Sequence, residues 1–175
     1  MDATLAVLLA TQLLTAAPRL PSPTEVGRAQ DVVYTDAYFK RLAIHRTASY
    51  AILPLFALQY AAGTQLYEKG DQAPEWAKVG HRIGATGVLV LFGTNVATGV
   101  PNLIAGRRDP NERARRFFHA TMMLTASAGF AATGILSERA ETSPDDRDLH
   151  RTVALTSVVI ATVGYLSMLD LFRPD

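Results

Sequence analysis

Four long runs without a formal charge dominate this 175-residue chain and limit what it can fold into. A transmembrane helix needs about 20 predominantly apolar residues to cross the hydrocarbon core of a bilayer, and the runs have about this length. A soluble bundle would instead require a polar outer face on each helix, which these runs lack. The sequence therefore predicts four membrane-spanning helices, at residues 47–67, 83–106, 117–137 and 152–169.

Short polar joints separate the runs and carry signals for helix starts. Asp109-Pro110 and Ser143-Pro144 each pair a capping residue with a proline at the first helical position. Pro54 is expected to kink the first helix. Because short joints make successive helices antiparallel neighbours, the expected fold is all-α, a transmembrane up-down-up-down four-helix bundle. The joints are expected at residues 68–73, 107–109 and 138–143.

The part of the chain before these runs has a different composition. Residues 3–18 are apolar and uncharged but short for a span, and residues 18–30 are rich in proline and polar side chains. We expect residues 1–37 to form an N-terminal apolar segment and a linker, and residues 38–175 to form the four-helix domain.

Loop charge indicates how the helices are oriented. Arginines gather in and around the second joint, and basic residues precede the first run, whereas the third joint is acidic. Positive residues favour the cytoplasmic side of a membrane. We therefore expect an integral protein of a bacterial inner membrane with both termini and the second joint in the cytoplasm.

Composition excludes several kinds of chemistry. The absence of cysteine rules out disulfides, thiolate catalysis, iron–sulfur clusters and covalent c-type haem. A net charge of +1 without a basic stripe gives no indication of nucleic-acid binding. No nucleophile–base pair or phosphate-binding loop of a soluble enzyme is visible. Histidines, carboxylates, hydroxyls, or a cofactor that they hold must carry the function.

The four histidines are regularly placed, one near the start of each apolar run. Three are followed directly by arginine, which resembles an internal repeat of about 35 residues. Because the helices alternate in direction, the first and third histidines fall at one membrane face, and the second and fourth at the other. Two inward-facing imidazoles across a bundle are what bis-histidine ligation of a haem iron requires. The expected pairs are His45 with His119, and His81 with His150.

Other interpretations of the histidines remain open. Any single histidine at a helix start is most simply a solvated side chain at the membrane interface. A proton relay or pH sensor would also use histidine, but it favours one continuous path over two separated pairs. Ionisable groups inside membrane spans are costly and tend to mark function, and the fourfold repetition favours a cofactor.

Small residues and arginines accompany the histidines. Each run ends in a small-residue patch whose glycine lies roughly on the face of the histidine at the other end, which leaves room for a flat macrocycle. Ordinary packing between membrane helices is the alternative. The guanidinium groups of the arginines suit haem propionates, because they bind carboxylates through paired hydrogen bonds. Snorkelling toward the membrane interface explains the position of each arginine equally well. The glycines are Gly63, Gly99, Gly134 and Gly164, and the arginines are Arg46, Arg82 and Arg151, with Arg41, Arg115 and Arg116.

In histidine placement and topology, residues 38–172 resemble the cytochrome b561-like class of membrane cytochromes. The resemblance implies two haem b groups, one near each membrane face, held by His45 with His119 and by His81 with His150. It implies an electron-transfer protein, or a subunit of a membrane oxidoreductase, that passes electrons across the membrane between a quinol or soluble carrier and a partner. Expected partners are membrane lipid and a redox protein or quinone, in a homodimer or a larger complex.

Three alternatives to this function stay open. A quinol-oxidising subunit would be a variant of the same class. A chlorophyll-type pigment can be held by single imidazoles, but it would not favour facing pairs. A non-redox scaffold or transport subunit would carry interfacial histidines only. An absorption spectrum separates the haem interpretation from the pigment and scaffold interpretations.

Overall fold

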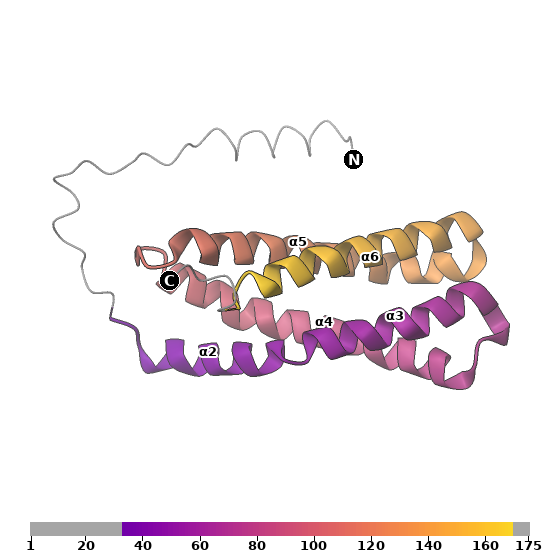
Figure 1. Cartoon of the computed structure of the whole chain (residues 1–175), viewed down its shortest axis with the longest axis horizontal. Coiled ribbons are helices and arrows are strands. Elements are labelled where there is room, and N and C mark those ends of the chain that lie inside the picture. The colour runs from indigo at the N-terminus through magenta and orange to yellow at the C-terminus, as the bar shows by residue number, and fades with distance from the viewer. Residues whose placement is uncertain (1–32, 170–175) are drawn as a thin grey trace, which may run out of the picture. The chain divides into compact units, whose positions relative to one another are not determined.

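The computed structural model describes residues 33–169, and every regular element within them is helical. The all-α prediction is confirmed for this part of the chain. The apolar segment and linker expected at residues 3–18 and 18–30 lie outside the described residues. The elements are α2 (Asp36–Ser49), α3 (Ile52–Lys69), a 3₁₀ turn (Gly70–Gln72), α4 (Glu75–Ala105), α5 (Arg113–Thr142) and α6 (Pro144–Leu166) (Figure 1).

The first apolar run is divided by a helix break at Tyr50 and Ala51. Pro54 explains the break, because it has no N–H and its ring would clash with the carbonyl four residues earlier, which belongs to Tyr50. Regular bonding resumes where the N–H of Leu55 donates to the carbonyl of Ala51 at 3.1 Å. The kink expected at Pro54 is therefore present as a break between α2 and α3.

Three helices, α4, α5 and α6, are long and apolar enough to cross a membrane. The first expected span, at residues 47–67, does not form one such helix, because the break leaves α3 with 18 residues that end in Glu68 and Lys69. Many large apolar side chains of the described helices point outward, among them Ile135 at 80% exposure and Ile83 at 65%. An extensive exposed apolar surface is typical of contact with a membrane.

From α3 onward, each helix packs against the next one along the chain. Both α2 and α3 pack on α4, α4 packs on α5, and α5 packs on α6, while α3 also touches α6 (Figure 1). The core between them contains three stacked or tilted phenylalanine rings, one each from α3, α4 and α5. Phe56, Phe92 and Phe130 are buried, with ring centres 4.8–6.1 Å apart.

The joint between α4 and α5 differs from the prediction. Asp109-Pro110 does not begin a helix, because α5 starts only at Arg113. The carboxylate of Asp109 accepts hydrogen bonds from the backbone N–H of Asn111 at 2.9 Å and from the hydroxyl of Tyr34. Arg116 adds an ion pair at 3.3 Å. The capping carboxylate is thus used to hold the joint, rather than to start the helix.

The third joint, in contrast, is shorter than predicted. Helix α5 continues through residues 138–142, so that Ser143 alone separates it from α6. The predicted start of α6 is confirmed, because the side chain of Ser143 accepts a hydrogen bond from the N–H of Asp146 at 3.3 Å and Pro144 occupies the first turn. Such a short connection keeps α5 and α6 antiparallel and in contact along their length.

The buried carboxylate of Asp109 makes folding stability depend on pH. The hydrogen bonds from Tyr34 and Asn111 lower the pKa of Asp109 below its ordinary value of 3.8. Its stabilising contribution is therefore complete above pH 3.8 and is lost as the pH falls through the lower pKa of the folded state. We expect Asp109→Asn to lower the melting temperature at neutral pH and to make little difference in strong acid.

Thermal unfolding of the detergent-solubilised protein at several pH values measures this effect. Asp71→Asn is the matched control, because it makes the same chemical change at an exposed carboxylate. If Asp109→Asn and Asp71→Asn melt at the same temperature at neutral pH, the role given to Asp109 is wrong.

Candidate functional site

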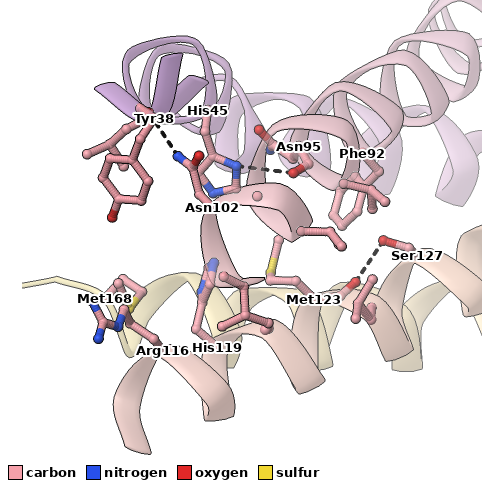
Figure 2. Close-up of a pocket in the computed structure, with 17 residues that line it drawn as sticks. Tyr38, His45, Phe92, Asn95, Asn102, Arg116, His119, Met123, Ser127 and Met168 are labelled. Carbon is pink, nitrogen blue, oxygen red and sulfur yellow. Dashed lines mark hydrogen bonds between the residues drawn. The ribbon is translucent and has the colours of Figure 1, made fainter. Parts of the chain in front are cut away.

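The structure brings the four histidines together in the two predicted pairs. The ring centres of His45 in α2 and His119 in α5 are 6.1 Å apart, and their planes are inclined by 77°. The ring centres of His81 in α4 and His150 in α6 are 6.4 Å apart, with an angle of 60°. Figure 2 shows His45 and His119 projecting toward one another from their two helices.

This spacing is the one that two imidazoles adopt on opposite sides of a single metal ion. A bond from a metal to an imidazole nitrogen is about 2.0–2.1 Å long, and the ring centre lies about 1.1 Å beyond the nitrogen. Two such imidazoles in line therefore have ring centres about 6.3 Å apart. Both measured distances lie close to this value.

Three of the four imidazoles are oriented by a backbone carbonyl of the neighbouring helix. A carbonyl can only accept, so the proton of each ring lies on Nδ1 and Nε2 is left unprotonated. Metal-binding histidines commonly donate their second nitrogen in this way, because the bond fixes the ring and strengthens the ligand. The Nδ1–oxygen distances are 3.2 Å from His45 to Asn95, 2.8 Å from His119 to Gly164, and 3.1 Å from His150 to Thr133.

The fourth imidazole, that of His81, differs from the others. Its Nδ1 is buried and has no hydrogen-bond partner among residues 33–169. The ring lies against Gly63 of α3, where an added Cβ would be 3.5 Å from Cε1 and 3.6 Å from Nδ1. The nearby amide of Gln59 donates to the backbone carbonyl of His81 at 2.9 Å. The two pairs are therefore not equivalent.

The small-residue patches lie beside histidines of neighbouring helices. Gly99 in α4 is in close contact with the ring of His45, because an added Cβ would lie 3.0 Å from Cε1 and 3.2 Å from Nδ1. Gly63 lies less tightly against His81, because an added Cβ there would make only ordinary van der Waals contact with the ring. At Gly99, the missing side chain lets the imidazole of His45 approach the neighbouring backbone closely.

The other two glycines occupy different surroundings. Gly164 supplies the carbonyl that accepts from His119, and an added Cβ there would meet Met122 at 2.9 Å. Gly134 follows Thr133, whose carbonyl accepts from His150, but an added Cβ would meet nothing within 4 Å. Gly164 thus permits close helix packing, and Gly134 faces open space.

A pocket adjoins the pair His45–His119 (Figure 2). Its cavity volume is about 140 Å³, and it opens to the surface of the helices. Asn95 also lines it, is 5% exposed, and has a side-chain amide without a hydrogen-bond partner in the described part of the chain. The apolar lining includes Leu42, Phe92, Val96, Val100, Leu103 and Met123.

The predicted arginines do not gather around the histidines. Arg46 and Arg82 are exposed, and the guanidinium of Arg151 lies over the ring of Tyr67 at 4.1 Å. The structure thus does not bring Arg46 or Arg82 into the interior with the histidine beside it in sequence. Each is turned away because consecutive helical residues differ by about 100° in direction.

The remaining arginines lie at the end of the molecule that holds the His45–His119 pair. Arg116 donates to the carbonyls of Gly106 and Asp109, and Arg115 donates to carbonyls at the end of α6, so both fasten chain segments. Arg41 lies one turn before His45 and donates its Nε to the side chain of Asn102 at 2.8 Å. Arg116 lines the pocket itself and Arg41 adjoins it through Asn102, so these two arginines lie nearest to an anionic group bound there.

The phenylalanine trio was not anticipated from the sequence. Phe56, Phe92 and Phe130 each follow the histidine of their segment by eleven residues, and Ala161 follows His150 by the same interval. All four are buried. The constant interval of eleven residues from each histidine is the sequence signal that could have identified these buried residues. It also places the phenylalanine trio along the helices between the two histidine pairs.

The donor set limits how a metal could be held. Within residues 33–169, no group of three or more histidine, cysteine, aspartate or glutamate side chains is placed to bind a bare metal ion. A porphyrin supplies four nitrogens of its own and needs only two axial ligands from the protein, which fits the histidine pairs. No protein-family model, curated protein or solved structure matches the chain.

Proposed function

We propose that the protein is a transmembrane di-haem b-type cytochrome, similar to the cytochrome b561-like class, that transfers electrons across a membrane. The observation that carries this proposal is the spacing of the two histidine pairs, 6.1 and 6.4 Å between ring centres. One metal ion between two imidazoles accounts for that spacing, and the carbonyl bonds of three of the rings leave Nε2 available to bind it.

The proposed membrane arrangement is an up-down-up-down bundle of four spans. In it, α2 and α3 together form the first span, and α4, α5 and α6 form the others. Along α4, His81 is 14 residues from Asn95 and 18 from Gly99, both of which contact His45, and these intervals correspond to about 21–27 Å of helix rise, most of the thickness of a hydrocarbon core. One pair would therefore lie near each membrane face, with both termini in the cytoplasm of a bacterial cell.

Haem bound in this way supplies reversible one-electron chemistry. The Nε2 atoms of the four histidines are its proposed ligands, and the carbonyl acceptors keep the rings in position. The lining beside His45 and His119 is mainly apolar, which would keep the surroundings of the bound group of low polarity. The phenylalanine trio fills the interior between the two pairs, so an electron would pass through packed protein. Arg41 and Asn102 would receive a propionate at the polar end of the pocket.

A reduced-minus-oxidised absorption spectrum of the purified chain, with haem quantified per chain, tests the proposal directly. We expect two low-spin b-type haems per chain. A chlorophyll-type spectrum would instead support pigment binding. Protein that is folded and free of both haem and pigment would refute the proposal and leave a membrane scaffold with interfacial histidines.

The electron donor and acceptor proposed are a membrane quinol or soluble carrier on one side and a redox partner on the other. Both a quinol and a soluble carrier would suit an electron-transfer subunit of a membrane oxidoreductase, as a homodimer or within a larger complex. Oxidation of the reduced protein by quinone analogues or by a soluble cytochrome, followed in a stopped-flow spectrometer, distinguishes the two classes of partner.

A further inference from the structure

We propose that His81 is a displaceable ligand, so that the His81–His150 site exchanges it for a small uncharged diatomic ligand. The His45–His119 site, in contrast, keeps both of its imidazoles. This inference rests on the proposed function, because the exchange takes place at a ferrous haem iron. With haem bound, His81 would give up its place as a ligand through Nε2 and the diatomic molecule would take that place, an exchange that needs neither an electron nor a proton.

The first observation is the missing partner of the His81 ring. A hydrogen bond from Nδ1 to a carbonyl fixes the rotation of an imidazole and makes it a stronger ligand. His45, His119 and His150 each have such a bond, whereas the buried Nδ1 of His81 has no partner among the described residues. A buried nitrogen without a partner is unfavourable, so rotation of this ring toward a partner or water lowers the free energy.

The second observation is the difference in how tightly the rings are confined. The Nδ1 of His45 lies 3.3 Å from the hydroxyl of Thr98 as well as near its carbonyl partner, and its ring is closely packed against Gly99. The ring of His81 has only ordinary van der Waals spacing to Gly63, and the residue is partly exposed. His81 therefore has both the weaker anchor and the room to swing away from an iron.

Gly63 offers a matched pair of variants that tests this cause. An added Cβ would lie 3.6 Å from Nδ1 of His81, so Gly63→Ser places a hydroxyl oxygen where it can accept from that nitrogen. Gly63→Ala adds the same carbon without the oxygen. We expect Gly63→Ser to anchor the ring and Gly63→Ala to leave it as it is.

The experiment uses the full-length, haem-loaded protein reduced with dithionite and titrated with carbon monoxide, followed by difference spectroscopy. We expect one carbon monoxide bound per two haems in the wild type and in Gly63→Ala. Gly63→Ser is expected to bind it about tenfold more weakly, the effect of one hydrogen bond on the competing imidazole. Equal affinities of Gly63→Ser and Gly63→Ala would overturn the proposal.

Two double variants assign the binding to one site and do not depend on Gly63. The variant His45→Ala/His119→Ala, which retains only the other pair, is expected to bind carbon monoxide, and His81→Ala/His150→Ala is not. Two low-spin haems that both fail to bind carbon monoxide would refute this inference alone. A folded protein without haem would refute the proposed function, and this inference with it.

Discussion

His45→Ala is expected to lower the haem content from two per chain to one. The ring centres of His45 and His119 are 6.1 Å apart, so one metal ion would fit between the two rings, and removing one imidazole would leave the proposed haem a single protein ligand in a largely apolar pocket. The other pair lies about 21–27 Å of helix rise away, beyond the phenylalanine trio, and its site should be unaffected. Quantification of extracted haem against protein concentration measures the loss.

The pairing itself is tested by combining substitutions. Because His45 and His119 share one site, His45→Ala/His119→Ala should retain one haem, as the single variant does. His45→Ala/His81→Ala affects both sites and should retain none. Circular dichroism confirms that the helices persist in each variant. Equal haem contents in the two double variants would contradict the assignment of pairs, even if each single variant loses haem.

The pairing was predictable from the sequence because it depends only on helix direction and position along the chain. One histidine at the start of each apolar run, with alternating directions, is enough to bring His45 to the level of His119 and His81 to that of His150. The break near Pro54 was predictable for a similar reason, since proline acts on its own helix. The proximity of the paired histidines and the break near Pro54 therefore both follow from helix topology or from a local sequence rule.

Features that depend on partners distant in the sequence were not predictable. The carboxylate of Asp109 carries a local signal for a helix start, but Tyr34 binds it from 75 positions away and Arg116 pairs with it. The carbonyls that orient the imidazoles carry no sequence signal at all, because every residue has one. The exposed direction of Arg46, however, follows from the 100° step between helical residues and could have been foreseen.

Gly99→Val is expected to empty the His45–His119 site without removing a ligand. A Cβ at Gly99 already lies 3.0 Å from Cε1 and 3.2 Å from Nδ1 of His45, and the two methyl groups of valine extend further. The imidazole must move, which breaks its bond to the carbonyl of Asn95 and changes its position relative to His119. Since ligands must be held within about 0.5 Å of their productive positions, the haem content should fall to about one per chain.

Gly134→Val is the matched control for this substitution. It places the same side chain at the corresponding small-residue patch of α5, where an added Cβ meets nothing within 4 Å. The variant should keep two haems and an unchanged spectrum, because the carbonyl that accepts from His150 belongs to Thr133. If both glycine variants lose haem equally, the loss reflects helix packing in general. A loss confined to Gly99→Val shows that the absent side chain positions the imidazole of His45.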